Sequence, residues 1–199
     1  MNFLAHIYLS HNDDEITIGN FIADSIRGNN YKHLPQRVQL GIVLHRSIDS
    51  FTDAHPIFRK STRRLHPHYS HYSGVIVDIY YDHFLAKNWA NYSDVPLADY
   101  TANFYSILED NYEILPLRVR RMMPHMITDD WLLNYSKLAG IDAVLKGINR
   151  RTQNKSRMNM AIVDLKKHYA QFENEFTEFF SELKAHAREE YISLTKTKI

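Results

Sequence analysis

Cysteine is absent from this chain of 199 residues, and glycine and proline are scarce, with six of each. The lack of cysteine excludes disulfides, zinc–thiolate sites, iron–sulfur clusters and cysteine nucleophiles. The small amount of glycine and proline excludes collagen-like and linker-like chains. The amino-terminal sequence also lacks the basic segment of a secretory signal peptide, and we therefore expect a cytoplasmic protein.

Long apolar runs and a surplus of charge of one sign are missing as well. The chain has 24 Lys and Arg against 23 Asp and Glu, a net charge of +1, which is too balanced to indicate nonspecific nucleic-acid binding. No run approaches the ~20 apolar residues that span a bilayer. No glycine-rich phosphate loop is found, which argues against ATP-driven chemistry. We expect neither a nucleic-acid nor a membrane partner.

What the chain does have is apolar residues at helical spacing. Hydrophobic residues make up 44% of the chain and aromatic residues 13%, and they recur three and four positions apart rather than alternating. This pattern predicts an all-α fold, a single compact multi-helix domain over residues 1–199 with a frayed tail after Tyr191. Helices are expected at about 2–9, 13–27, 35–53, 56–66, 72–89, 96–111, 116–123, 129–138, 141–151 and 158–184.

Polar residues interrupt three of the apolar helices in pairs four residues apart, so that each pair lies on one helix face. A buried carboxylate is costly unless it is paired or bound to a metal. Each pair taken alone is typical of a local hydrogen bond, but three together favour a shared divalent cation, which suits mixed imidazole and carboxylate ligands. The pairs are Asn20 and Asp24, His45 and Asp49, and Asp78 and Asp82.

Basic residues concentrate in the segment from Arg27 to Arg64, which holds eight basic residues and two acids. Such a segment near a site that cleaves a phosphoester would attract an acidic partner and raise its rate of association. A basic helix face with no particular partner remains the alternative. The residues predicted to meet an acidic partner are Arg27, Lys32, Arg37, Arg59, Lys60, Arg63 and Arg64.

Four sequence blocks in the first 90 residues closely resemble the acyl carrier protein phosphodiesterase family. They are NFLAH at 2–6, GNFIAD at 19–24, GIVLHRSIDSFTDAHP at 41–56 and DIYYDHFLA at 78–86. The resemblance implies a helical fold distantly related to the HD phosphohydrolases. It also implies hydrolysis of the phosphodiester that joins 4'-phosphopantetheine to a serine of holo-acyl carrier protein. The cofactor implied is a divalent cation, with Mn²⁺ expected first and Mg²⁺, Fe²⁺ or Co²⁺ as alternatives.

The resemblance also suggests site residues. Unlike ordinary HD proteins, this chain has no adjacent His-Asp pair, and the two residues occur in reverse order as Asp82-His83. Arg46 is expected to bind phosphate, and His6 to act as a ligand or proton donor. The candidate catalytic residues are Asp24, His45, Arg46 and His6, and the candidate metal ligands are Asp24, His45, Asp49, Asp78, Asp82 and His83.

Two other functions remain open at this point. An HD-like phosphohydrolase would keep the metal but act on a nucleotide or another small phosphoester. A non-catalytic helical module would satisfy its buried acids and histidines within the protein and would bind an acidic partner through its basic surface.

Overall fold

The computed structural model describes residues 2–196, and no strand occurs in that range. The predicted all-α fold is confirmed, as is a single compact helical domain. The α-helices are α1 (Phe3–Tyr8), α2 (Asp14–Ile22), α3 (Gln36–Ala54), α4 (Pro56–Tyr69), α5 (Ser73–Lys87), α6 (Leu97–Asp110), α7 (Leu117–Thr128), α8 (Trp131–Asn134), α9 (Leu138–Arg151), α10 (Ala161–Lys167) and α11 (Tyr169–Lys196). Short 3₁₀ turns lie between them: η1 (Ala23–Ser25), η2 (Ser70–Tyr72), η3 (Trp89–Asn91), η4 (Tyr112–Ile114) and η5 (Met158–Met160).

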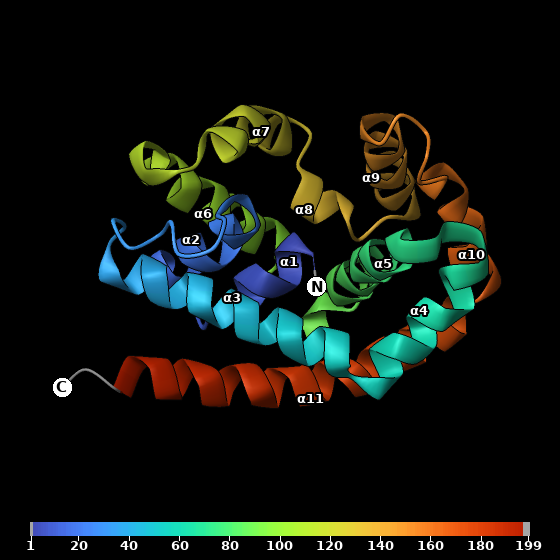
Figure 1. Cartoon of the computed structure of the whole chain (residues 1–199), viewed down its shortest axis with the longest axis horizontal. Helices are drawn as coiled ribbons and strands as arrows, with labels where there is room; N and C mark the ends of the chain where they lie inside the picture. Colours follow the sequence, from blue (N-terminus) through green and yellow to red (C-terminus); the bar gives the residue numbers. More distant parts are fainter. Residues whose placement is uncertain (1, 197–199) are drawn as a thin grey trace.

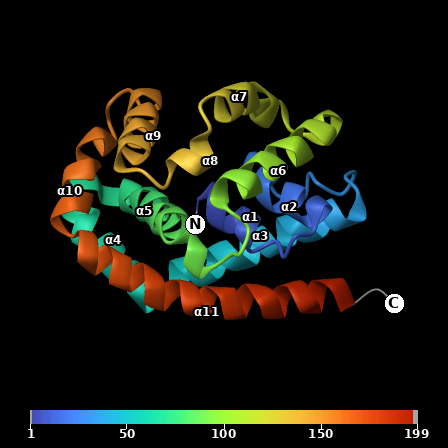
Figure 2. The ribbon, with the colours of Figure 1, turned by 180° about the vertical axis from the view of Figure 1, so that it is seen from behind.

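The helices pack in layers, as both views of the ribbon show (Figures 1 and 2). The long α11 forms one edge of the molecule, and α3 and α4 lie directly against it. The short α1 lies in the middle beside α2 and α5, α6 runs past α2, and α7 to α9 form the opposite edge. Residues near the amino terminus are therefore surrounded by later parts of the chain.

Local sequence explains where the helices around α1 begin. The Asp13 carboxylate accepts a hydrogen bond from the Ile16 amide at 3.1 Å and caps α2, as expected for aspartate at this position. The imidazole of His55 accepts a bond from the Ile57 amide and caps α4, whose first residue is Pro56. Proline suits that position because its missing N–H would have no partner there.

A pair of glycines brings α2 and α3 into close contact. A Cβ atom on Gly19 would overlap the carbonyl of Val38, and one on Gly41 would overlap the carbonyl of Ile16. Only glycine therefore allows the two backbones to approach so closely. This contact places Asn20 of α2 beside His45 of α3.

The core is rich in aromatic residues. Along α11, Phe172, Phe176, Phe179 and Phe180 are fully buried, and their spacing confirms the face that the helical period predicts. Edge-to-face pairs such as Tyr80–Phe172, with ring centroids 5.1 Å apart, connect this face to α5 and add to the stabilisation from burial.

Several helix ends differ from the sequence prediction. The helix expected over 158–184 is broken at His168 into α10 and α11. Helix α4 continues through Pro67 to Tyr69, beyond the end predicted at about residue 66. The proline removes one intrahelical bond, but only two residues of the helix follow it. Helix α11 continues past Tyr191, which contacts the ring of His11, to Lys196. Residues 197–199 of the expected tail lie outside the described residues.

Candidate functional site

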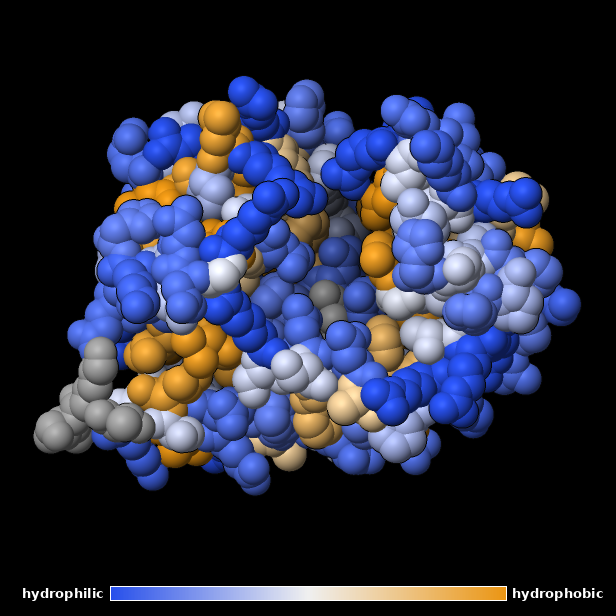
Figure 3. All heavy atoms as spheres, in the orientation of Figure 1, coloured by the Kyte–Doolittle hydropathy of each residue, from blue (hydrophilic) through white to orange (hydrophobic). Residues whose placement is uncertain are grey.

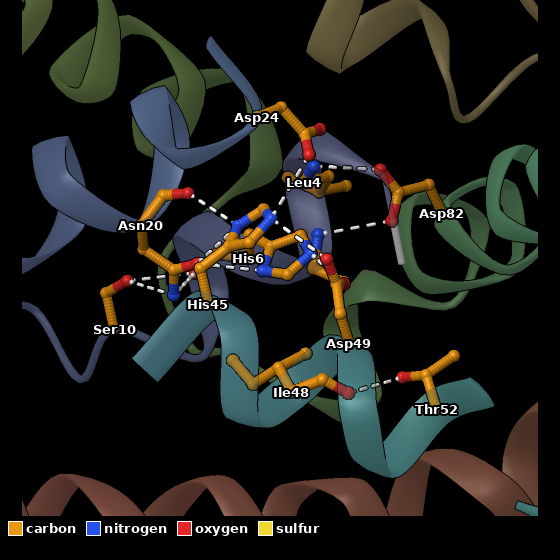
Figure 4. A network of polar contacts seen from close by, with 11 residues as sticks. Leu4, His6, Ser10, Asn20, Asp24, His45, Ile48, Asp49, Thr52 and Asp82 are labelled. Atoms are coloured by element: carbon orange, nitrogen blue, oxygen red, sulfur yellow. Dashed lines mark hydrogen bonds and ion pairs between the residues drawn. The ribbon is translucent and has the colours of Figure 1, made fainter. Parts of the chain in front are cut away.

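Two buried imidazoles stack at the centre of the molecule (Figure 4). His6 comes from α1 and His45 from α3, and their rings lie 4.0 Å apart at an angle of 18°. Both side chains are almost fully buried. Their stacking matters because two adjacent imidazolium ions would repel each other, so the pair favours at most one proton of charge.

The side chain of Asn20 orients both rings. Its amide nitrogen donates to the carbonyl oxygen of His6 at 2.8 Å and to Oγ of Ser10 at 3.0 Å, which fixes the direction of the amide. Its Oδ1 then accepts from Nδ1 of His6 at 2.7 Å, and Nδ1 of His45 donates to the Asn20 carbonyl at 2.8 Å. Because these partners are acceptors, the network assigns a hydrogen to each Nδ1 and directs each Nε2 to the other side.

Two carboxylates face the Nε2 atoms. Asp49 Oδ1 lies 3.2 Å from Nε2 of His6, and Asp49 Oδ2 lies 3.0 Å from Nε2 of His45. Asp24, on η1, approaches the same atom of His45 at 3.3 Å. The Asp49 side chain is 41% exposed and that of Asp24 69% exposed. The cluster therefore has a buried imidazole floor and a carboxylate rim that is open to solvent.

The charges of these four groups leave the cluster negative. Burial, assisted by the neighbouring His45, lowers the pKa of His6 to about 4, so this ring is neutral at pH 7. Burial also acts to lower the pKa of His45, but hydrogen bonds to Asp24 and Asp49 outweigh it and raise the pKa to about 9. The hydrogen bond to His45 lowers the pKa of Asp24. Burial acts to raise the pKa of Asp49, but the hydrogen bond from His45 and the nearby His6 ring outweigh it and lower that pKa. At pH 7 the two carboxylates thus carry two negative charges, and the protonated His45 supplies the single positive charge.

This donor set fits a divalent cation. One possible ligand atom from each of His6, His45 and Asp49 lies within 4.8 Å of the other two. Among the described residues, no hydrogen bond of good geometry reaches Nε2 of His6, despite the nearby Asp49 oxygen. Metal-binding histidines commonly donate their other ring nitrogen to a neighbouring oxygen, as both rings do to Asn20 here. Mixed nitrogen and oxygen ligands suit Mn²⁺, Fe²⁺ or Zn²⁺.

Asp82 lies close to this cluster but binds backbone instead. Its carboxylate accepts hydrogen bonds from the amides of Leu4 at 2.8 Å and Ala5 at 3.2 Å, so α5 caps the amino-terminal end of α1 (Figure 4). These amides have no partner within α1, and a carboxylate suits the positive end of a helix. Burial raises the pKa of Asp82 to about 7, although the two amides oppose that change.

His83 is not brought to the cluster. Its Nδ1 lies 2.7 Å from the carbonyl oxygen of Tyr135, and its Nε2 lies 2.7 Å from the hydroxyl of Tyr169. Nδ1 therefore donates and Nε2 accepts, so both ring nitrogens serve contacts with α11 and the segment after α8. Burial lowers the pKa of His83, and we leave it out of the ligand set.

Asp78 lies near the cluster, and Arg46 points away from it. Asp78 on α5 is half-buried; burial raises its pKa, and the charge of Asp49 acts in the same direction, so the two carboxylates are near each other. Arg46 does not point to the cluster: its guanidinium donates to the carbonyl of Gly28 at 2.5 Å and lies 5.0 Å from the Tyr31 ring centroid.

Some of the predicted docking residues have structural partners. Arg64 makes two hydrogen bonds to the buried Glu175, at 2.7 and 2.6 Å, and Lys60 lies 3.3 Å from the same carboxylate. Arg37 pairs with Asp13. The side chains of Arg27, Lys32, Arg59 and Arg63 are exposed.

Asn20 is the residue whose role the sequence did not reveal. Its spacing to Asp24 was visible, but nothing in a single chain shows that one amide contacts two histidines from different helices. Ser10, which donates to the His6 carbonyl at 2.9 Å, was likewise missed.

The face of the molecule is hollowed between α7 and α9, toward the middle where α1, α3 and α5 meet (Figure 3).

Comparison with known proteins identifies the relatives of this chain. Residues 1–183 match the family model "Acyl carrier protein phosphodiesterase". The chain belongs to the acyl carrier protein phosphodiesterase family.

Named relatives of the acyl carrier protein phosphodiesterase family cover nearly the whole chain. The protein of that name from Photorhabdus laumondii is 33% identical, over 90% of this chain and 91% of its own. The one from Pectobacterium atrosepticum is 30% identical, over 90% and 94% of the two chains. The one from Escherichia coli O157:H7 is 33% identical, over 94% and 97%. No solved structure matches significantly.

Membership of the acyl carrier protein phosphodiesterase family makes this chain a phosphodiesterase, a hydrolase of phosphoric diesters. The matched region contains His6, Asp24, His45 and Asp49. Within residues 2–196, none of the helices combines the length and the apolar character that crossing a membrane requires.

Proposed function

We propose that this chain is a metal-dependent phosphodiesterase that releases 4'-phosphopantetheine from holo-acyl carrier protein and leaves the apo form. The observation that carries the proposal is the convergence of two buried Nε2 atoms on the Asp49 carboxylate, with both Nδ1 atoms held by Asn20. The names of the relatives support the substrate. The negative cluster supports the cation.

His6, His45, Asp49 and Asp24 are the residues that would hold the cation, and Mn²⁺ is the ion we expect first, with Mg²⁺, Fe²⁺ or Co²⁺ as alternatives. When bound, a divalent cation lowers the pKa of a water molecule and neutralises charge on a phosphoryl oxygen. Asn20 fixes the orientation of both rings, and such outer contacts sustain the basicity of the ligand nitrogen.

The exposure of the rim determines how the substrate reaches the site. The diester enters from the solvent side, where Asp24 and Asp49 lie, because the imidazoles close the other side. Asp24 is the more exposed carboxylate, and we assign it the role of the base that accepts a proton from the attacking water. The water oxygen forms the new bond to phosphorus and the bond from phosphorus to the serine oxygen breaks. The serine oxygen leaves as a hydroxyl with the proton that Asp24 took from the water and now returns.

Docking of the carrier is assigned to the basic segment, with exposed Arg27, Lys32, Arg59 and Arg63 as the principal contacts. Arg64 and Lys60 are already engaged by Glu175, and Arg37 by Asp13, so we expect them to contribute less. Association through exposed charges weakens as salt rises, and KM for the carrier should therefore increase with ionic strength.

The decisive experiment is mass spectrometry of holo-acyl carrier protein incubated with the protein and Mn²⁺. We expect the carrier to lose the mass of its phosphopantetheine group, and the loss to stop when EDTA is added. Failure with each of Mn²⁺, Mg²⁺, Fe²⁺ and Co²⁺ would contradict the proposal. Preferred cleavage of nucleotides in competition would instead indicate a small-phosphoester hydrolase. Absence of stoichiometric metal would indicate a binding module.

A further inference from the structure

A pocket of about 380 Å³ lies between the segment that follows η1 and the segment around η4. Ser25 is one of its lining residues. That residue follows Asp24 directly, and the Asp24 carboxylate is the exposed rim of the His6–His45 cluster. The pocket therefore includes the residue next in the chain to the exposed rim of the proposed catalytic cluster.

The wall of this pocket that follows η1 is hydrogen-bonded to α3, next to the cluster. Arg46, the neighbour of His45, donates to the carbonyl of Gly28 and packs on the ring of Tyr31. At the other end of the wall, Nε2 of Gln39 donates to the carbonyls of Lys32 at 3.2 Å and Leu34 at 2.8 Å. The segment is thus held at both ends and has a fixed position relative to His45, which makes Arg46 a positioning residue for the pocket.

The opposite wall is held by another arginine. Arg120 of α7 donates to the carbonyls of Leu115, at 2.9 Å, and Glu113, and its guanidinium lies 4.8 Å from the ring centroid of Tyr112. Next to this wall, Tyr112 is 41% exposed and Leu117 is 62% exposed. Large apolar side chains that remain exposed beside a pocket are typical of a binding surface.

The lining indicates what kind of ligand the pocket takes. It combines polar groups, from Ser25, Asn30 and His33, with apolar ones, among them Leu34 and Ile114. Neither Lys nor Arg is among its lining residues, and Glu113 is the acid among them, with a side chain that is 91% exposed. The lining is therefore unsuited to a second phosphate and suited to a neutral chain in which methylene groups alternate with amides.

We propose that this pocket binds the pantetheine arm of the substrate, while the phosphodiester lies at the His6–His45 cluster. The inference rests on the proposed function and adds the subsite that recognises the arm. Pantetheine is a neutral linear chain of methyl, methylene, hydroxyl and amide groups, which matches the lining. Its phosphate end would lie toward Asp24 and its thiol end toward the exposed side of the pocket.

Filling the pocket tests this assignment. His33→Trp replaces an exposed lining residue, so the fold should tolerate it, and Ile114→Trp fills the pocket from the opposite wall. We expect each variant to lower the ratio of kcat/KM for holo-acyl carrier protein to kcat/KM for bis(4-nitrophenyl) phosphate, which has no arm, by about tenfold.

A matched control exists on the same molecule. Asn103→Trp fills a different pocket, of about 320 Å³, between α2 and α6, and should leave the ratio unchanged. An unchanged ratio in both His33→Trp and Ile114→Trp, or an equal fall in Asn103→Trp, would overturn the assignment.

Binding of pantetheine alone separates this inference from the proposed function, because it requires neither metal nor turnover. In NMR spectra of the full chain labelled with ¹⁵N, added pantetheine should shift the amide signals of Asn30, His33 and Ile114, and His33→Trp should abolish those shifts. Shifts confined to other residues, or none at millimolar pantetheine, would refute the subsite even if the enzyme hydrolyses holo-carrier. Failure of hydrolysis with these shifts intact would refute only the proposed reaction.

Discussion

Helices α3 and α5 are both apolar and both carry acids at helical spacing, but the structure uses the two rows differently. On α3, His45 and Asp49 meet His6 and form a cluster whose carboxylates are partly exposed. On α5, the Asp82 carboxylate is fully buried and binds two backbone amides, and His83 binds two tyrosines. The same sequence pattern thus gives a solvent-facing candidate site on one helix and buried structural hydrogen bonds on the other.

The difference lies in what covers each row. The face of α3 that carries His45 and Asp49 meets His6 of α1 and Asp24 of η1, whose side chain is largely exposed. Helix α5 is packed against α1, α4, α9 and α11. The Asp82 carboxylate is consequently fully buried and must find a partner in the protein, whereas Asp78 is half-buried. Exposure, and not the spacing of acids, therefore separates a candidate site from a structural contact.

The largest effect is expected for Asp49→Asn, which changes the α3 row without altering its shape. Its carboxylate contacts both imidazoles, and removing a metal ligand should lower kcat/KM for holo-carrier about 10³-fold or more. Because the side chain is partly exposed, the free energy of unfolding should change by about 1 kcal/mol or less. Steady-state kinetics and urea denaturation in EDTA measure the two effects, and near-normal turnover would exclude Asp49 from the site.

Asp82→Ala makes the opposite comparison on α5. The substitution leaves the buried amides of Leu4 and Ala5 without their acceptor, which should lower the free energy of unfolding by about 2–4 kcal/mol. Metal stoichiometry by elemental analysis should remain that of the wild type. If Asp82→Ala instead lost the metal at unchanged stability, the capping role given to Asp82 would be wrong and the sequence-based ligand assignment would be favoured.

The sequence predicted much of this arrangement, for reasons tied to local geometry. Helical periodicity identified the helices and the face of α3 on which His45 and Asp49 lie together. It could not show the contacts of Asp82, because the partners of that residue are 78 and 77 positions away in the chain, and spacing within one helix says nothing about a neighbouring helix end. It also could not show the contact of Arg46, because the path of the segment through Gly28 determines where the guanidinium lies.

Asn20→Ala tests how far the α3 cluster depends on the contact with α2. The variant removes the acceptor of the His6 Nδ1 hydrogen and frees that ring to turn, whereas His45 keeps its bond to the backbone carbonyl. Outer contacts of this kind are worth about 10–100-fold in metal affinity, which titration with Mn²⁺ under calorimetry measures. Ser10→Ala, which removes a single contact of the same amide, serves as the milder control. Unchanged affinity in Asn20→Ala would show that the ring orientation does not need this side chain.

The smallest effect is expected for His83→Asn, which examines the α5 row by pH. Burial lowers the pKa of His83 in the folded state, Lys87 acts in the same direction and Glu173 opposes them. The unfolded chain therefore binds more protons below about pH 6.5, and the wild type loses stability as the pH falls through that value. Asparagine can still donate to the Tyr135 carbonyl but does not titrate, so the variant should cost about 1 kcal/mol at pH 8 and the deficit should shrink toward pH 5. Denaturation curves across this range measure the difference in the free energy of unfolding. If the deficit of the variant instead grew in acid, the ring of His83 would be charged in the folded protein. A charged ring could not accept the hydrogen bond from Tyr169, so the contacts assigned to His83 would be wrong.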